Sequence, residues 1–318
     1  MSEPVFEIVV ATENNRYLEW QAMVFHWSCT RVMGISPVFV VHNADSALLP
    51  GYQLIRNRGG NVQTAPSLRE VGGIEYPPRN TAATLQHVRT TADYIVLCDA
   101  DMVFLKPLPW SSLPLTQNSI SFDHVDYLNP NHPRSAAQIA HACRADGTDP
   151  ETLKSATRGG VPHVIPRSQR MALSREWLRY MDLFPVIDHP RDPDLPPYSY
   201  PKGPHHPWLT AMWALILATQ RLRLNPIETD WCLNNQSGNR MLPDASSTDH
   251  CLLHYCFGDD SFNKRTVRLE REVTDPEFWS IPGGDGTVNG FLRDQFRHTG
   301  AFFGVLPETS GFFLAPES

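Results

Sequence analysis

The sequence predicts an α/β fold in which a mostly parallel β-sheet is flanked by helices. Three observations support this class. An apolar segment at 5–12 is followed by a helical segment and a second apolar segment at 35–42, the order of a β-α-β unit. Residues 94–98 are apolar throughout, as expected of a strand buried on both faces of a parallel sheet. Strand-like and helix-like segments then alternate as far as residue 255.

The first half of the chain supplies the opening strands. Residues 5–12 carry the β-branched side chains that favour a strand. A polar break follows, and residues 17–31 form an expected helix with an aromatic-rich face. Residues 35–42 give the second strand, and residues 54–55 are expected to form a short strand. Residues 81–90 are expected to form the helix that leads into the fully apolar strand.

The second half has more proline and longer loops. We expect strands at 119–122, 161–165 and 251–255, and helices at 133–145, 168–181 and 207–220. Pro207 stands in the first turn of its helix, where proline is favoured. The proline- and histidine-rich segment 185–207 is expected to be a loop, as is the stretch from 225 to 231. The segment after Gly283 is expected to wrap the surface as a tail.

Composition narrows the class of protein. The chain has 318 residues and a net charge of −7, which argues against a general nucleic-acid partner. The start of the chain lacks the pattern of a secretory signal, and the most apolar helix candidate, 209–218, is too short to span a bilayer. The six cysteines form no Cys-x-x-Cys pair, so we expect reduced thiols. These features predict a cytoplasmic protein without a membrane span.

Two acids follow the fully apolar strand. In extended chain Asp99 and Asp101 would point the same way, about 7 Å apart along the strand. Two such carboxylates can hold one divalent cation. Acid-x-acid spacing also occurs elsewhere, for example at Glu228 and Asp230, so the apolar setting is what distinguishes the first pair. The alternative is that the strand ends at Asp99 and both acids are solvated turn residues.

A histidine lies in a late strand of the chain. His254 is followed by Gly258 and Lys264. A histidine with two carboxylates suits Mn²⁺, with Mg²⁺ as the other candidate. Gly258 would let backbone approach a phosphate, and Lys264 would supply a compact positive charge. The alternative for His254 is a buried histidine bonded to a backbone carbonyl.

The residues that carry these features resemble a known family. The segment 99–109 is similar to the acidic motif and following proline segment of the plant hydroxyproline O-arabinosyltransferases and peptidyl-serine galactosyltransferases, which are GT-A glycosyltransferases. The segment 254–259 resembles their late His-Tyr-x-x-Gly motif. Residues 161–169 and Trp208 fall in matching order, so the resemblance covers roughly 5–264. The chain departs from the family in lacking a membrane anchor and in having Ala211 where an acid is expected.

The resemblance implies a GT-A-like, Rossmann-type fold in a single large domain at 1–282. Its donor half would be about 1–125 and its acceptor half about 126–282, with 283–318 as a tail packing on the domain. It implies metal-dependent, retaining transfer of a sugar from a nucleoside-diphosphate sugar, with a UDP-sugar favoured. The acceptor would be a hydroxyl of a peptide, a glycan or a small metabolite.

The resemblance also implies roles for individual residues. Asp99, Asp101 and His254 would hold Mn²⁺ or Mg²⁺ against the diphosphate of the donor, and Lys264 would add to the stabilisation of the leaving group. A departing phosphate oxygen could take the acceptor proton, so no base is strictly required. Thr12, at the end of the first strand, and Ala100, between the two acids, are further donor-binding candidates.

Arg79 and Asn80 precede the fully apolar strand at a position where related folds contact the donor. The alternative is that Asn80 caps a helix and Arg79 is solvated. Glu228 or Asp230 could face the anomeric carbon or the acceptor hydroxyl, or both could be surface acids.

An acceptor cleft has its own candidates. His205, His206 and Trp208 could line it, or they could be a loop pair and a core tryptophan. Gly159 and Gly160 could let a sugar approach the backbone, or could form only a turn.

Two rival functions stay open. Asp99-x-Asp101 also fits the haloacid-dehalogenase-type phosphatases, in which Asp99 would be the nucleophile and Gly258-Asp259-Asp260 would imitate the late acids. That motif normally ends the first strand, whereas here a β-α-β unit precedes it. The second rival is a non-catalytic binding subunit, and the intact set of acids, histidine and lysine argues against it.

Overall fold

The structure is a computed structural model of the whole chain. It describes residues 3–43, 47–71, 74–125, 127–131, 133–153, 155–184, 207–234, 249–255, 262–264, 267, 269–284 and 286–307.

The contacts divide the chain into two compact units, each built from separate stretches of sequence. The first unit comprises Met1–Phe6, Ser67–Val96 and Leu113–Thr229. The second unit comprises Glu7–Pro66, Leu97–Ser112 and Asp230–Ser318. Strand β6 (Tyr94–Asp99) therefore begins in the first unit and ends in the second.

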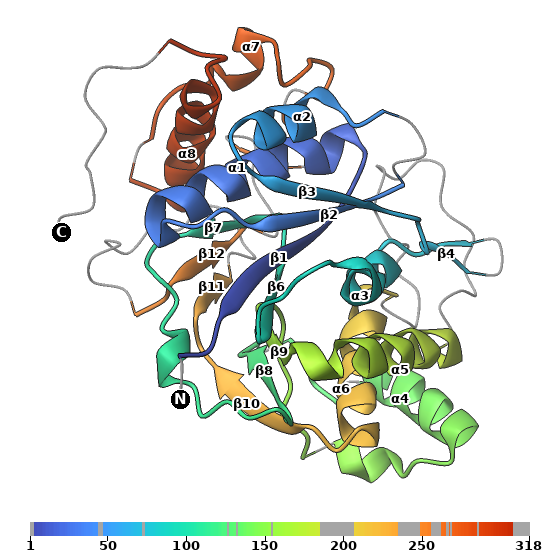
Figure 1. The fold of residues 1–318 in the computed structure, drawn as a ribbon. Coiled ribbons are helices and arrows are strands. Elements are labelled where there is room, and N and C mark those ends of the chain that lie inside the picture. Colours follow the sequence, from blue (N-terminus) through green and yellow to red (C-terminus); the bar gives the residue numbers. More distant parts are fainter. Residues whose placement is uncertain are drawn as a thin grey trace. The chain divides into compact units, whose positions relative to one another are not determined.

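The second unit begins with the expected β-α-β order. Its opening elements are β1 (Phe6–Glu13), α1 (Arg16–Met33), β2 (Val38–His42), α2 (Pro50–Asn57) and β3 (Asn61–Ala65). Strand β2 is buried along its whole length and pairs in parallel with both β1 and β3, as Figure 1 shows. Asn15 caps α1 by accepting a hydrogen bond from the Leu18 N–H, and Gly34 ends the helix in the left-handed region at φ 68°.

The short strand expected at 54–55 is wrong. These residues lie in α2, which begins with Pro50 in its first turn and buries Tyr52 and Ile55 on one face. The proline fixes a helical start, and the spacing of Tyr52 and Ile55 is helical rather than alternating.

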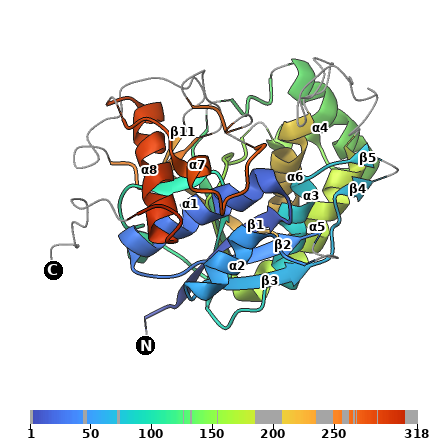
Figure 2. The same ribbon diagram turned by 90° about the horizontal axis from the view of Figure 1, so that it is seen from above.

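The second unit also contains a three-stranded sheet and two C-terminal helices. These are β7 (Met102–Phe104), β11 (Cys232–Asn234), β12 (Leu252–His254), α7 (Pro276–Trp279) and α8 (Val288–Phe302). The sheet order is β11-β12-β7; β12 runs parallel to β11 and antiparallel to β7. Figure 2 shows α8 beside α1 and α7.

The segment after Gly283 does not simply wrap the surface. Thr287 caps α8, and Phe296 of this helix is fully buried. The Phe296 ring lies 4.5 Å from that of Trp279 and 5.6 Å from that of Trp20, between ring centroids. Phe296 of this segment thus belongs to the core of the second unit.

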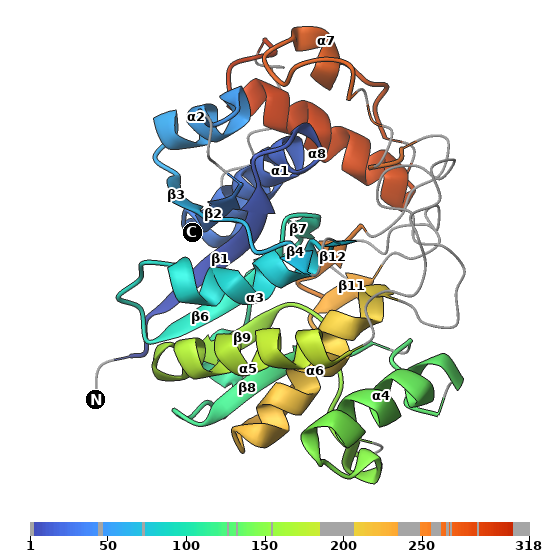
Figure 3. The same cartoon turned by 90° about the vertical axis from the view of Figure 1, so that its right-hand side faces the viewer.

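The first unit packs helices around a second group of strands. Its elements are β4 (Glu70–Val71), β5 (Ile74–Glu75), α3 (Pro78–His87), β8 (Ser119–Asp123), α4 (Pro133–Asp146), β9 (His163–Pro166), α5 (Arg170–Leu183), α6 (Pro207–Arg221) and β10 (Asn225–Thr229). Three short 3₁₀ helices are η1 (Trp110–Ser112) in the second unit, and η2 (Pro150–Leu153) and η3 (Arg167–Gln169) in the first. Helix α5 packs against α3, α4 and α6 (Figure 3).

The loop expected at 225–231 is wrong in its first part. Residues 225–229 form β10, which pairs in parallel with β8. Only Thr229 is buried in this strand, so it lacks the apolar run by which buried strands are recognised.

The five-stranded sheet has the order β3-β2-β1-β6-β9. The predicted α/β class, with a mostly parallel sheet flanked by helices, is confirmed. Among the described residues, no helix combines the length and the apolar character needed to cross a membrane. Five of the cysteines are described, and all five are buried free thiols.

Candidate metal centre

The first acid of the Asp-x-Asp segment ends a strand, and the second lies in the turn that follows. Strand β6 ends at Asp99, Ala100 and Asp101 form a turn, and β7 begins at Met102. The expectation that both acids point the same way from one extended strand is therefore wrong. The strand ends where the alternative interpretation placed its end.

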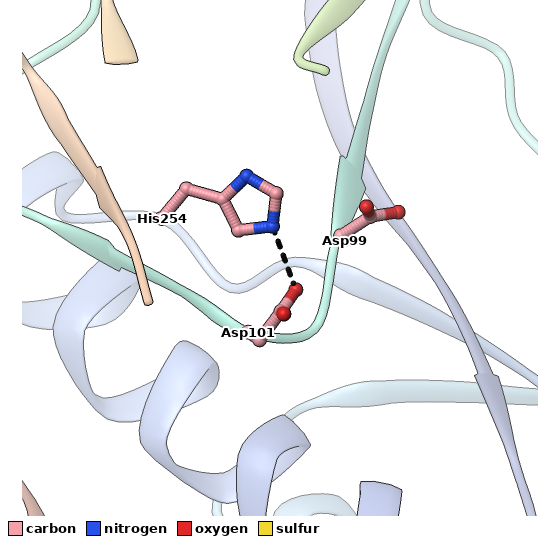
Figure 4. Close-up of side chains that lie close together, drawn as sticks. All are labelled: Asp99, Asp101 and His254. Carbon is pink, nitrogen blue, oxygen red and sulfur yellow. Dashed lines mark ion pairs between the residues drawn. The ribbon is translucent and has the colours of Figure 1, made fainter. Parts of the chain in front are cut away.

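The pairing of β7 with β12 brings the histidine to this turn. His254 stands opposite Met102 in the antiparallel register, and the next backbone N–H, that of Tyr255, donates to the Asp101 carbonyl at 3.1 Å. This pairing places the imidazole beside the Asp101 carboxylate, although the two residues are far apart in sequence (Figure 4).

The three side chains are close enough to share one ion. The Nε2 of His254 lies 3.2 Å from an Asp101 carboxylate oxygen, and one ligand atom from each of Asp99, Asp101 and His254 lies within 4.8 Å of the others. Atoms bound to one small divalent ion at about 2.1 Å lie within about 4.2 Å of one another, so little adjustment is needed. The side chains of Asp101 and His254 are only 13% and 12% exposed, so the acids are not solvated turn residues.

The charges around the two acids are unequal. Lys264 Nζ donates a hydrogen bond to the second carboxylate oxygen of Asp101. Burial raises the pKa of Asp101, but the charges of Lys264 and His254 and their hydrogen bonds outweigh it and hold that pKa well below its usual range. Burial and then the charge of Asp101 raise the pKa of Asp99 to about 6. Asp101 is thus held as an anion, whereas Asp99 has too little positive charge nearby to offset its burial.

The far side of the imidazole contacts an amide. His254 Nδ1 lies 3.1 Å from Asn234 Oδ1. Asn234 could not be found from the sequence pattern, because it lies 20 residues before His254 and only the pairing of β11 with β12 brings the two together.

Comparisons with known proteins bear on the fold that carries this cluster. No protein-family model and no curated protein sequence matches the chain. A solved structure of the galactosyltransferase LgtC, in complex with donor and acceptor sugar analogues, is similar over 95% of this chain and 97% of its own, with a TM-score of 0.52 and 9% identity. The likeness shows the fold. The predicted GT-A-like fold is confirmed by it.

Two further structures are more distant. The bifunctional glycosyltransferase WbbM matches 94% of this chain and 50% of its own, with a TM-score of 0.48 and 12% identity. Mouse xyloside xylosyltransferase 1 matches 79% of this chain and 98% of its own, with a TM-score of 0.40 and 11% identity.

Two of the predicted donor-binding residues, Thr12 and Ala100, are buried. Thr12 Oγ1 lies 2.7 Å from the hydroxyl of Tyr52, which donates to the Glu13 carbonyl at 2.7 Å. Ala100 is 3% exposed. Thr12 therefore ties the end of β1 to α2.

Arg79 and Asn80, both in the first unit, form hydrogen bonds with the backbone of Leu68. Arg79 forms an ion pair with Asp182, and its Nε donates to the Leu68 carbonyl at 2.9 Å. Asn80 is buried, and its Oδ1 accepts from the Leu68 N–H at 2.8 Å. The alternative of a capping Asn80 and a solvated Arg79 is wrong, because Pro77 occupies the cap and the Arg79 side chain is 12% exposed.

Glu228 and Asp230 are exposed. Glu228 pairs with His124 at 2.9 Å, and its side chain is 58% exposed. Asp230 lies 3.8 Å from His250, with its side chain 74% exposed. Neither belongs to the three-residue cluster.

The paired glycines have a packing role. Gly160 exchanges two backbone hydrogen bonds with Asp123, at 2.8 and 3.1 Å. A Cβ on Gly159 would lie 2.1 Å from the Asp123 carbonyl oxygen, so only glycine allows this approach to the end of β8.

Several predicted site residues lie outside the described residues: His205, His206, Gly258, Asp259, Asp260 and the side chain of Trp208.

Proposed function

We propose that this protein is a metal-dependent glycosyltransferase that moves a sugar from a nucleoside-diphosphate sugar to a hydroxyl acceptor. The cluster of Asp99, Asp101 and His254 carries this proposal. It lies at the C-terminal end of β6, the end at which α/β sheets bind their ligands. The likeness of the fold to a galactosyltransferase supports the same reaction class.

The residues of the cluster fit a divalent cation. Two carboxylates and an imidazole form a mixed oxygen and nitrogen set that suits Mn²⁺ and accommodates Mg²⁺. The raised pKa of Asp99, about 6, indicates a place where more positive charge would be favourable. A bound cation would supply electrostatic stabilisation of the negative charge that grows on a departing diphosphate.

Each residue would have a distinct task. Asp101 would bind as a permanent anion, and Asp99 would complete the carboxylate pair. His254 would contribute Nε2 as a neutral ligand. Lys264 now bonds Asp101, and it would transfer its hydrogen bonds to the phosphate oxygens of the donor when a cation takes over Asp101. Lys264 would therefore contact the leaving group and not the acceptor.

The finer features of the reaction rest on the family resemblance. It favours a UDP-sugar donor, Mn²⁺ or Mg²⁺ as the metal, and retention of anomeric configuration by a front-face mechanism like that of the plant arabinosyl- and galactosyltransferases. The acceptor would be a peptide, glycan or small-metabolite hydroxyl. Thr12, Arg79, Asn80, Ala100 and Gly258 stay donor-site candidates. We also propose a cytoplasmic location, with no nucleic-acid partner.

The question of a catalytic base is separate. A phosphate oxygen of the leaving group could take the acceptor proton, so the proposal needs no protein base. The remaining candidates for contact with the anomeric carbon or the acceptor are Glu228 and Asp230. Both are exposed side chains in the present structure.

The rival phosphatase function is less well supported. Its aspartate nucleophile normally ends the first strand, whereas β1, β2 and β3 precede β6 here. The likeness to LgtC over 95% of the chain also favours the glycosyltransferase fold. The non-catalytic alternative differs only in whether a bound donor reacts.

The test is a thermal-shift screen of nucleoside diphosphates and nucleotide sugars with and without Mn²⁺, followed by slow hydrolysis of the best donor. A ligand that binds only the native state raises its stability. We expect stabilisation that needs both metal and nucleotide, and its loss in Asp101→Asn but not in Glu228→Gln. Hydrolysis of a generic phosphate ester instead would favour the phosphatase, and binding without any turnover would favour a binding subunit. Equal stabilisation by nucleotide with and without Mn²⁺ would contradict the proposal.

A further inference from the structure

The second contact of His254 points to a residue that positions the metal ligand. We propose that Asn234 fixes the tautomer and orientation of His254, so that Nε2 presents its lone pair to the cation. This inference rests on the proposed metal site and adds a residue to it. Asn234 does not touch the reacting atoms, so its role would be that of a positioning residue.

The fold sets up the contact through backbone pairing. In the parallel register of β11 and β12, Asn234 stands opposite His254. Both residues end their strands. The side chains meet with Oδ1 and Nδ1 3.1 Å apart. On its other side β12 pairs with β7, and this pairing places Nε2 of His254 toward Asp101. The imidazole is therefore held between an amide on one side and a carboxylate on the other.

The chemistry of the amide decides the tautomer. An amide oxygen can only accept a hydrogen bond, so Nδ1 must carry hydrogen when it contacts Oδ1. In a neutral imidazole with hydrogen on Nδ1, Nε2 has the free lone pair that a metal needs. The opposite tautomer would place hydrogen on Nε2 and lose the bond to Asn234. A cation would bind this lone pair at Nε2, while Nδ1 keeps its hydrogen and donates it to Asn234 Oδ1.

A purely structural role for Asn234 gives different expectations. If the amide only fills space between β11 and β12, a leucine of similar volume should serve as well. If it orients the imidazole, an aspartate should serve at least as well, because a carboxylate accepts the same hydrogen bond and raises the basicity of the ring. Leucine and aspartate therefore separate the two roles.

The experiment measures Mn²⁺ affinity by the electron paramagnetic resonance signal of the free ion, with Mn²⁺ alone as the probe. We expect Asn234→Leu to bind Mn²⁺ about 10- to 100-fold more weakly and Asn234→Asp to bind it at least as tightly as the wild type. Asn61→Leu, at an exposed position that starts β3 in the same unit, is the matched control and should leave the affinity unchanged. In the metal-free protein, ¹⁵N spectra of the His254 ring should show hydrogen on Nδ1 in the wild type and in Asn234→Asp.

The outcomes separate this inference from the function it rests on. Equal Mn²⁺ affinity in the wild type and Asn234→Leu would overturn the role of Asn234 and leave the metal site standing. A wild-type protein that binds no Mn²⁺ would remove the metal site itself. If Asn234→Leu does not fold, Asn234→Asp decides, because weaker Mn²⁺ binding in that variant would contradict the role of the amide as an acceptor.

Discussion

Two acid pairs with the same spacing lie in opposite surroundings. Asp99 ends a strand that is buried along most of its length, Asp101 lies just beyond it, and the Asp101 side chain is 13% exposed. Glu228 and Asp230 come at the end of β10, which is mostly exposed, and their side chains are 58% and 74% exposed. An acid-x-acid pattern therefore carries no information about function on its own.

The difference lies in what surrounds each carboxylate. Asp101 contacts an ammonium and an imidazole that are themselves nearly buried, so little water screens their charges. Glu228 contacts one exposed histidine, and such a pair gains little because water screens it and the side chains lose freedom. A strand that is apolar up to its final acid therefore indicates carboxylates whose charges are poorly screened by water. Five substitutions, from the largest expected effect to the smallest, test this contrast and extend it to Glu19, a third acid that is buried.

Asp101→Asn should destabilise the metal-free protein by about 3–5 kcal/mol, because it leaves the nearly buried Lys264 ammonium without its counter-charge. Urea unfolding at neutral pH measures the change. If only a bound metal stabilised the cluster, the variant would instead keep its fold nearly intact. A loss below about 0.5 kcal/mol would favour that simpler view.

Lys264→Met should lower donor turnover by roughly tenfold to a thousandfold, equivalent to about 1.4–4 kcal/mol of lost stabilisation of the leaving group. In the absence of donor the same variant should bind Mn²⁺ more tightly, because Asp101 is released from its internal cation. Lys106→Met removes the same charge elsewhere in the second unit and serves as control. Unchanged donor hydrolysis in Lys264→Met would show that this lysine does not serve the diphosphate.

Glu19 is a buried acid held mainly by a backbone amide. Burial raises its pKa from 4.5 to about 7, against a 2.6 Å hydrogen bond from the Gly51 N–H and the charge of Arg16. Between pH 4.5 and 7 the folded protein therefore binds more protons at Glu19 than the unfolded chain, so the free energy of unfolding falls as pH rises.

Glu19→Gln should remove this dependence. The variant should match the wild type near pH 4 and exceed its stability above pH 7, by an amount on the order of 3 kcal/mol. Denaturant unfolding across this range gives the difference, with the exposed Glu151→Gln as control. A gap that widens toward low pH would contradict the raised pKa.

Asp99→Asn should have the opposite sign from Asp101→Asn. Because burial and the charge of Asp101 raise the pKa of Asp99 to about 6, its charge is unfavourable at pH 8 without metal. Removing that charge should stabilise the metal-free protein by on the order of 1–3 kcal/mol while weakening Mn²⁺ binding. The midpoint of urea unfolding at pH 8 and a Mn²⁺ titration measure the two effects. Destabilisation of the metal-free protein by both asparagine variants would mean that the two acids are equivalent.

Glu228→Gln should change the free energy of unfolding by less than about 0.5 kcal/mol, because its pair with His124 is exposed. Mn²⁺ affinity should not change. Thermal unfolding and the Mn²⁺ titration are sufficient to check both. A clear loss of metal binding would remove the contrast between the two acid pairs.

The parts of the fold that follow from local pattern could be predicted from the sequence. The opening β-α-β unit and the end of β6 at a pair of acids are encoded in short apolar runs. The prediction of His254 as a metal ligand depended on the chemistry of the imidazole and on the resemblance to the plant glycosyltransferases. The turn at Ala100 and Asp101 was not foreseeable from alternation, since β6 and β7 are both apolar and only these two residues separate them.

Features that depend on distant pairing were out of reach. Asn234 reaches the site only because β11 pairs with β12. Strand β10 has mostly exposed side chains and so gives no apolar signal. Helix α8 was not predicted, because glycines in its segment obscure the helical pattern. One of them, Gly300, packs its backbone against Trp279 at a distance that leaves no room for a Cβ.

The late position of β12 also affects how the protein is made. Asp101 and Lys264 are 163 residues apart, so a ribosome adding about 5–20 residues per second needs roughly 8 to 30 seconds between them. During that interval β1, β2, β3 and β6 have been synthesised, but the two acids have neither the histidine nor the lysine that neutralises them. A nascent chain stalled before residue 252 would contain all five strands of the sheet β3-β2-β1-β6-β9 and an uncompensated pair of negative charges at the end of β6, and we expect such a chain to be held by chaperones or degraded.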